Sequence, residues 1–325
     1  MNLFDDDQEG FGRPPKRTRP RTKDRPDYSS LPLGRVVGID RGRYRCVVDS
    51  VPVTAAKARA LGRKSVIVGD VVRLDSDVSG DEGTLARIAE VEERHTVLLR
   101  SADDVDSIER PIVANANQVV IVTALADPPP RVGMIDRILV AAYDAGLTPV
   151  LALTKTDLGS PAEILSDYGP LDVEMYELQP DCDLGPFREA LRDKVSVFVG
   201  HSGVGKSTLV NALIPSAERV TGEVNDVTGR GRHTSTSAVA LELPGGGWVV
   251  DTPGVRSFGL SHIEPEHILA AFSDLAAIAE DCPRGCTHMA DESACALDAA
   301  VESGVLPRAR LDSFRRLNPL ALSHG

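Results

Sequence analysis

Residues 195–213, VSVFVGHSGVGKSTLVNAL, decide the interpretation of this chain. The apolar run Val195 to Val199 predicts a buried strand, and Lys206 to Leu213 predicts a helix. Between them lies a match to the phosphate-loop pattern G-x-x-x-x-G-K-[ST], in the strand–loop–helix context that the motif requires and that disfavours a glycine turn without a ligand. In such a loop backbone N–H groups hold phosphate oxygens, Lys206 reaches the β and γ phosphates and Ser207 binds magnesium. The predicted nucleotide-binding residues here are Gly200, His201, Ser202, Gly203, Val204, Gly205, Lys206, Ser207 and Thr208, with Lys206 also catalytic.

Two shorter motifs also follow apolar strands. Residues 251–254, DTPG, place the Asp251 carboxylate at the end of the strand Trp248 to Val250, where a magnesium-side carboxylate is needed. Residues 154–157, TKTD, follow the strand Pro149 to Thr154 and resemble the N/T-K-x-D element of GTPases. In that element the carboxylate accepts hydrogen bonds from guanine, and adenine lacks the donors. The predicted base-binding residues are Thr154, Lys155, Thr156 and Asp157, and the predicted base is guanine.

The order of these motifs is the most informative feature. In ordinary GTPases the phosphate loop comes first and N-K-x-D comes last, whereas here residues 154–157 precede the loop and residues 251–254 follow it. The order of the motifs therefore predicts a circularly permuted GTPase domain. From Gln118 onward strands and helices alternate, which predicts a largely parallel sheet covered by helices.

The N-terminal third has a different composition. Residues 1–30 are rich in proline and basic residues, with seven basic side chains and one acid between Phe11 and Pro26, and we expect a disordered basic arm. A solvated tail that only aids solubility is equally consistent with this composition. Residues 31–105 contain about five short β-rich runs separated by glycines and turn residues, which predicts a small β-barrel. The runs are 35–39, 43–50, 64–74, 83–91 and 96–99.

The C-terminal region predicts helices and a metal site. We expect helices over 267–279 and 308–317. Between them lie Cys282, Cys286, His288 and Cys295, three thiols and an imidazole that suit one structural zinc ion. The alternative, buried free cysteines beside a surface histidine, is disfavoured because such clustering is rarely idle.

Taken together, these motifs resemble the RsgA family, circularly permuted GTPases that assist maturation of the small ribosomal subunit. Further residues that carry the resemblance are 114–118 (ANANQ), 135–137 (IDR) and 229–234 (GRGRHT). It extends over nearly the whole chain after the arm. It implies a multidomain α/β protein with an N-terminal OB-fold barrel, a central permuted GTPase domain over 111–268 and a C-terminal zinc-binding helical domain over 269–325. It also implies binding to the subunit late in maturation, with GTP hydrolysis stimulated by the subunit and coupled to release.

Three positions depart from the family pattern. Three residues separate the first two cysteines and six separate His288 from Cys295, where the family usually has four and five. No Ser-Ala element follows the strand near Val173 to Tyr176, so guanine contacts from that loop stay unassigned. Thr154 stands where Asn is more usual.

The residue that orients the attacking water also needs a substitute. Val255 follows the DTPG motif where Ras-like GTPases carry Gln, and a valine side chain can neither donate nor accept a hydrogen bond. His233 resembles the family histidine suspected of this role, and Thr234 is the predicted further magnesium ligand. A contact of Arg230, Arg232 and His233 with ribosomal RNA is an equal alternative.

The barrel offers a basic face and few aromatic side chains. Arg43 and Arg45 alternate along one strand and follow Arg41, so they suit contacts with RNA phosphates. Tyr44 is the only aromatic residue between Leu33 and Asp104, which argues against base stacking. A solvated basic edge is the competing interpretation.

Composition limits the remaining classes of function. The net charge of −12 argues against a protein that coats nucleic acid over its whole surface. The sequence has no membrane-length apolar stretch and no signal peptide, so we expect a cytoplasmic protein. The motifs and the family resemblance imply GTP or GDP, magnesium, and the small subunit with its rRNA as partners, and we expect a monomer. Two other classes of function are alternatives: an RNA-binding assembly module that senses GTP without catalysis, and a phosphate-loop kinase, for which no lid arginines are recognisable.

The permutation suggests one conformational hypothesis. The chain leaves the nucleotide site through residues 251–254 and enters the zinc region, so loss of the γ-phosphate could reorient that region relative to the barrel. A rigid zinc domain that only adds contact area is the alternative.

Overall fold

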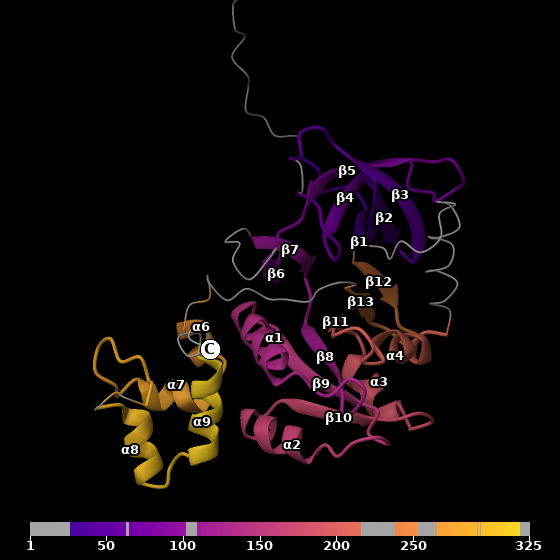
Figure 1. The fold of residues 1–325 in the computed structure, drawn as a ribbon. Helices are drawn as coiled ribbons and strands as arrows, with labels where there is room; N and C mark the ends of the chain where they lie inside the picture. The colour runs from indigo at the N-terminus through magenta and orange to yellow at the C-terminus, as the bar shows by residue number, and fades with distance from the viewer. Residues whose placement is uncertain are drawn as a thin grey trace, which may run out of the picture.

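The computed structural model describes residues 27–62, 65–101, 109–215, 238–252, 263, 265–290, 292 and 294–318. Figure 1 shows a β-barrel, a central α/β domain and a group of C-terminal helices. The strands are β1 Leu33–Asp40, β2 Arg43–Val48, β3 Val51–Lys57, β4 Val71–Ser76, β5 Ala86–Val91, β6 Val97–Ser101, β7 Glu109–Ala114, β8 Gln118–Ala124, β9 Thr148–Thr154, β10 Glu174–Leu178, β11 Val195–Val199, β12 Val239–Glu242 and β13 Trp248–Asp251. The helices are α1 Val132–Asp144, α2 Ala162–Tyr168, η1 Gly169–Leu171, α3 Gly185–Leu191, α4 Lys206–Leu213, α6 Pro265–Ala270, α7 Ser273–Ala279, α8 Ala296–Glu302 and α9 Arg308–Leu317.

The predicted N-terminal barrel is confirmed, with a different set of strands. It closes in the order β1-β2-β3-β5-β4, with β4 pairing back to β1. Alternation along β2 buries Tyr44, Cys46 and Val48 inside the barrel. The expected strand run at 96–99 instead becomes β6, which pairs with β7 in a separate two-stranded sheet. The missing fifth strand is β3, which the sequence analysis did not identify.

The central domain is the expected parallel sheet. Strands β10, β9, β8, β11 and β13 are neighbours in that order and run parallel, and β12 adds an antiparallel strand beside β13. Strands β8 and β11 are buried along their whole length, as expected for a sheet covered on both faces. The phosphate-loop strand β11 thus lies between β8 and β13, the first and last of these strands along the chain.

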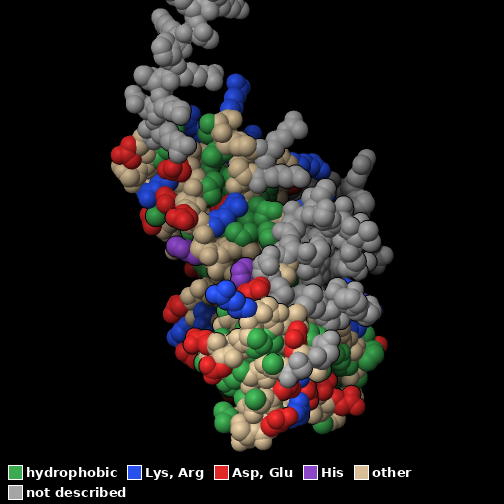
Figure 2. Space-filling view, turned by 90° about the vertical axis from the view of Figure 1, so that its left-hand side faces the viewer, with side chains coloured by type: hydrophobic (Ala, Val, Ile, Leu, Met, Phe, Trp, Pro, Cys, Tyr) green, Lys and Arg blue, Asp and Glu red, His purple; other side chains and the backbone are tan. Residues whose placement is uncertain are grey.

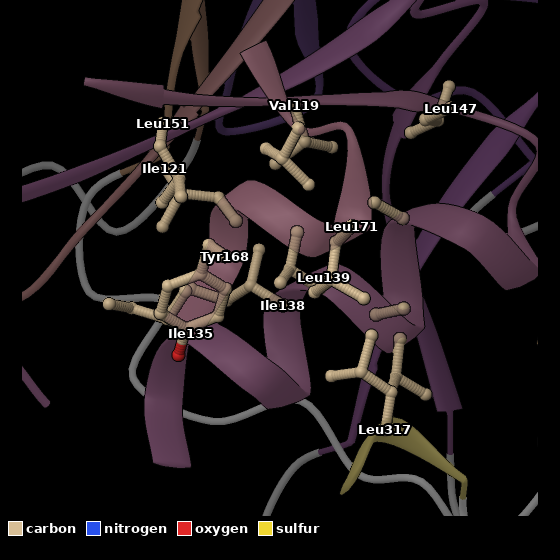
Figure 3. Close-up of a cluster of buried hydrophobic side chains, with 14 of the residues drawn as sticks. Val119, Ile121, Ile135, Ile138, Leu139, Leu147, Leu151, Tyr168, Leu171 and Leu317 are labelled. Atoms are coloured by element: carbon tan, nitrogen blue, oxygen red, sulfur yellow. The ribbon is translucent and has the colours of Figure 1, made fainter. Parts of the chain in front are cut away.

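The C-terminal helices pack on α1 and share a core with the sheet. Figure 3 shows Leu317 of α9 at the edge of a cluster of buried side chains that also includes residues of α1, β8 and β9. The expected single helix over 267–279 is two helices, α6 and α7, interrupted at Phe272. Phe272 is buried there and forms edge-on ring contacts with Tyr143 and Phe314.

The barrel is joined to the central domain by backbone pairing, amide hydrogen bonds and apolar contacts of Val37 and Ile39 of β1. Gly38 of β1 pairs with Val239 of β12, which makes the barrel strands and the central sheet continuous. The residues ANANQ form the second joint. Asn115 accepts a hydrogen bond from the His95 N–H and donates one to the Gly69 carbonyl oxygen, while Asn117 accepts one from the Val195 N–H.

Candidate nucleotide site and metal centre

The phosphate loop connects β11 directly to α4. Gly203 and Gly205 have φ values of +85° and +89°, in the left-handed region that favours glycine. At Gly200 an added Cβ would lie 2.5 Å from the Val122 carbonyl oxygen of the neighbouring strand β8. Ser207 and Thr208 lie exposed in the first turn of α4. The geometry accounts for the three glycines and leaves the helix N-terminus open to an anion.

Lys206 and Asp251 meet at this end of the sheet. The Lys206 ammonium forms an ion pair with the Asp251 carboxylate, and both side chains are largely shielded from solvent. Strand pairing aligns Asp251 with Phe198, and the buried Thr252 hydroxyl donates to the Phe198 carbonyl oxygen at 2.9 Å. The structure therefore brings together the two charged groups predicted to hold phosphate and magnesium.

The TKTD element is joined to the phosphate loop through Thr154. This residue is buried, and its hydroxyl lies 2.5 Å from the Val204 carbonyl oxygen and 3.3 Å from that of Thr123. Donation to Val204 links the base element to the phosphate loop, a role that the sequence analysis did not assign to this threonine.

The remaining TKTD residues lie at the same end of β9. The Lys155 ammonium donates to the Asp127 carbonyl oxygen in the loop before α1. Asp157 is exposed, as a group that accepts hydrogen bonds from a ligand must be. Leu178, the last residue of β10, pairs with Thr154, so the following loop begins beside TKTD without a Ser-Ala sequence.

His201 is the remaining polar side chain of the phosphate loop. Its Nδ1 lies 2.7 Å from the Ser202 carbonyl oxygen, which can only accept, so Nδ1 carries the proton. His201 also lines a small cavity beside α1 together with Pro128, Arg131 and Met134. Several predicted residues lie outside the described part of the chain: Arg230, Arg232, His233, Thr234, Pro253, Gly254 and Val255.

The four predicted metal ligands come together in the C-terminal helical region. Their ligand atoms all lie within 4.8 Å of one another. The His288 Nδ1 is 3.6 Å from the Cys282 Sγ and 3.8 Å from the Cys295 Sγ. Zinc bonds of about 2.3 Å to sulfur and about 2.0 Å to nitrogen, at tetrahedral angles, separate these atoms by about 3.5 Å. The spacing therefore fits a metal ion of zinc's size despite the altered loop lengths.

The chemistry of these four residues also suits a metal. Burial raises the pKa of the Cys286 thiol to about 11 and lowers the pKa of His288, so its imidazole is neutral at physiological pH. A bound cation would displace the thiol protons. The Ala296 N–H at the start of α8 donates to the Cys282 Sγ at 3.2 Å, which favours a thiolate.

Arg315 supports this centre and was not identified from the sequence. Its guanidinium donates to the carbonyl oxygens of His288 and Met289 at 2.7 and 3.1 Å. It also binds both carboxylate oxygens of Asp298 at 3.0 and 2.6 Å, so α9 holds the loop that carries His288.

The predicted basic face lies on the outside of the barrel. Arg41 and Arg43 are exposed, and Arg45 is half-buried because its guanidinium lies across Gly38. Gly38 is the residue that pairs with Val239, so Arg45 lies beside the joint with the central sheet. No helix in the described part of the chain is long and apolar enough to cross a membrane.

The sequence matches one protein-family model and a number of curated proteins. The model of the RsgA GTPase family matches residues 91–261. A small ribosomal subunit biogenesis GTPase RsgA from Chlorobaculum tepidum is 38% identical over 285 residues, which cover 85% of this chain and 90% of the relative. A small ribosomal subunit biogenesis GTPase RsgA 1 from Vibrio vulnificus is 37% identical over 265 residues, covering 79% of this chain and 74% of that relative.

Two solved structures share the fold. The crystal structure of YjeQ from Thermotoga maritima matches with a TM-score of 0.64 at 25% identity, over 90% of this chain and 98% of that one. The structure of YloQ, described as a circularly permuted GTPase, also has a TM-score of 0.64, at 24% identity over 92% of this chain and 97% of that one. The predicted permuted GTPase fold is thereby confirmed.

Proposed function

The chain belongs to the RsgA GTPase family, and from this premise we propose that it is a GTP-hydrolysing assembly factor that binds the small ribosomal subunit late in maturation. In this proposal the subunit stimulates hydrolysis, and hydrolysis releases the factor. The observation that carries the proposal is the convergence of three motifs, distant and permuted in sequence, at one end of the sheet. The Lys206–Asp251 ion pair and the Thr154–Val204 hydrogen bond join them.

The positions of these groups suggest how they would handle GTP. Lys206 would leave Asp251 for the β and γ phosphates, and Asp251 would act with Ser207 and Thr234 on the magnesium that accompanies the nucleotide. The backbone N–H groups of residues 200–208 would hold the phosphates. Charge developing on the phosphate oxygens would thus meet positive groups already in place.

Guanine selectivity is assigned to the TKTD element. Asp157 would accept hydrogen bonds from the two guanine donors, while the Lys155 stem lies along the ring. Because Val255 cannot orient water, we assign that role to His233, with contact to rRNA as its alternative.

We further propose one structural zinc ion, held by Cys282, Cys286, His288 and Cys295. The supporting observation is the agreement of the S···N separations with tetrahedral zinc. The ion would stabilise the C-terminal helices and take no part in hydrolysis.

The remaining assignments concern partners. Arg41, Arg43 and Arg45 form an outer basic strip that suits rRNA phosphates. We propose that the protein acts as a monomer in the cytoplasm, where small subunits mature.

GTP turnover titrated with purified small subunits tests the proposal. We expect slow intrinsic turnover, on the order of 10⁻⁴ to 10⁻² per second, and strong stimulation by subunits. Lys206→Ala should abolish turnover, whereas Lys57→Ala on the barrel should leave it unchanged. Turnover that subunits do not accelerate would contradict the proposed stimulation.

Nucleotide competition tests the base assignment separately. Asp157→Asn should shift preference from guanine toward xanthine nucleotides, because an amide donates where the carboxylate only accepts. Equal affinity of the wild-type protein for ATP and GTP would refute guanine selectivity.

A further inference from the structure

A cleft of about 770 Å³ opens between the central domain and the C-terminal helices, away from the nucleotide site. Its central-domain wall includes Thr148 and Glu174, the first residues of β9 and β10, whereas TKTD lies at the opposite ends of these strands. The facing wall includes residues of α6 and α7. The volume lies within the range of about 300–1,000 Å³ typical of ligand pockets.

The inner surface of the cleft is polar in part and apolar in part. Leu147, Pro149 and Leu171 are buried among its lining residues, and Tyr143 is half-buried beside them. Burial raises the pKa of Tyr143 to about 12, so its ring is uncharged at neutral pH. This surface suits an aliphatic chain, or a cationic group that packs on the face of the Tyr143 ring.

The rim of the cleft is acidic. The Asp172 side chain is 83% exposed, and Glu174 is also exposed. Arg310 lies in the same cleft, but its charge is already compensated by Asp172 at 3.1 Å and Asp274 at 2.9 Å. A further carboxylate that lines the cleft belongs to Asp144 of α1, and its Oδ1 lies 2.7 Å from the Nδ1 of His267 of α6. The rim therefore carries an excess of negative charge.

We propose that this cleft binds arginine or lysine side chains from an extended basic segment of a protein component of the small subunit. An aliphatic stem would lie on the apolar part of the inner surface, and its cationic tip would reach the rim carboxylates. RNA is disfavoured because its phosphates would face these carboxylates. Figure 2 shows acidic, basic and hydrophobic side chains interspersed over the part of the molecule below the barrel. The inference rests on the proposed binding to the small subunit and adds a protein contact to it.

Removing the charge of two rim carboxylates distinguishes a basic protein partner from RNA, because the two partners predict opposite changes in affinity for the small subunit. The double variant Asp172→Asn, Glu174→Gln keeps side-chain size, and Arg310 keeps its bond to Asp274. The matched control is Glu280→Gln, Glu302→Gln, which removes the same charge from exposed positions outside the cleft. Binding of each full-length protein to purified small subunits would be measured with a non-hydrolysable GTP analogue.

We expect about three- to tenfold weaker binding for the rim variant and no change for the control. Tighter binding of the rim variant would mean that the cleft faces rRNA, and unchanged binding would mean that nothing charged occupies it. Either outcome overturns the inference. Failure of the wild-type protein to bind subunits would instead refute the proposed function, so the two failures are distinguishable.

A photo-crosslinking amino acid identifies the partner directly. It would replace Ala271, an exposed residue of the cleft, and in a control protein Val305, which is 72% exposed outside it. After irradiation on purified subunits, position 271 should give crosslinks within lysine- and arginine-rich protein segments. Crosslinks to rRNA, or a yield no greater than at position 305, would overturn the proposal.

Discussion

The two accessory parts of the molecule are attached to the central sheet in physically different ways. The barrel encloses its own core, which includes Val36, Tyr44 and Leu74. It meets the central domain through backbone pairing and the amides of Asn115 and Asn117, with Val37, Ile39 and Val68 also contacting the large core. The C-terminal helices instead contribute to the same hydrophobic core as α1, β8 and β9.

Charged side chains reinforce the C-terminal attachment. The Arg316 guanidinium lies 4.8 Å from the centre of the Tyr168 ring and 3.4 Å from the buried Asp136 carboxylate. Tyr168 donates to the same carboxylate at 2.9 Å. Burial raises the pKa of Asp136, so this polar junction depends on its two partners. The barrel therefore has a separate core of its own, whereas the buried side chains of the C-terminal helices belong to the core of the GTPase domain.

This comparison bears on the hypothesis that hydrolysis reorients the zinc region relative to the barrel. A shared core resists sliding because interiors are tightly packed. The shared core therefore argues against movement of the C-terminal helices relative to the central domain, so the two would move together. Relative motion is then expected at the barrel joint.

Metal removal should have the largest effect on the comparison. Chelation is expected to destabilise the C-terminal region by more than about 5 kcal/mol, because structural zinc contributes folding free energy directly. Hydrogen exchange should show protection lost first in α7, α8 and α9, then in α1, with the barrel unaffected. Equal loss in the barrel would contradict the separation of the two cores, and zinc-free protein by elemental analysis would refute the metal assignment.

Truncating the shared core should have the next largest effect. Phe314 is 1% exposed and packs on Phe272, so Phe314→Ala should lower the free energy of unfolding by about 3–5 kcal/mol. Denaturant unfolding should show the C-terminal helices and the GTPase domain melting together, with weaker GDP binding. The barrel counterpart Leu74→Ala should destabilise the barrel and leave GDP affinity intact. If Phe314→Ala spares GDP binding under conditions where the C-terminal helices melt, the core is not shared energetically.

The barrel joint should respond to Gly69→Ala. Gly69 has φ of +91°, and an added Cβ would clash with the Ala114 carbonyl oxygen of β7. The matched control is Gly83→Ala, which has φ of +85° but open space around it. Both variants should lose about 1 kcal/mol of folding free energy to backbone strain. Gly69→Ala should lose about 1–3 kcal/mol more because of the clash. Equal losses in thermal unfolding would show that the joint tolerates the clash.

Lowering the pH should produce the smallest difference between the C-terminal helices and the barrel. Hydrogen bonds from Arg315 hold the pKa of Asp298 below its usual value, so this pair stabilises the protein above about pH 4 and the contribution is lost as pH falls through the folded-state pKa. Asp298→Asn should cost no more than about 1 kcal/mol at pH 7, and this cost should shrink as pH falls below about 4. The neutral amides of the barrel joint do not titrate. A difference between wild type and variant that stays constant as the pH is lowered below about 4 would contradict this assignment.

Local signals explain what could be predicted from the sequence. The bounds of β11, α4 and α9 agree with expectation, because apolar periodicity and the phosphate-loop glycines mark them directly. Strand β3 was missed because Pro52 and its alanines give little strand propensity; pairing with β2 and β5 stabilises it. The interruption at Phe272 likewise reflects packing against Tyr143 and Phe314, which no local pattern encodes.

The candidate sites also contain some features that the local sequence predicts and others that only the fold creates. Ligand types and motif spacing predicted the metal residues and the convergence of Lys206 with Asp251. The supporting roles of Arg315 and Thr154 could not be predicted, because each depends on a backbone carbonyl brought close only by the fold.

The position of β11 between β8 and β13 also has a mechanical consequence. The barrel precedes the start of β8, and the chain toward the C-terminal helices leaves from the end of β13. Once the β1–β12 pair and the contacts of the C-terminal helices with α1 had separated, pulling the two accessory parts in opposite directions would load the parallel pairs β8–β11 and β11–β13 in shear. The strand that carries the phosphate loop thus lies on the line of tension between the two ends of the molecule.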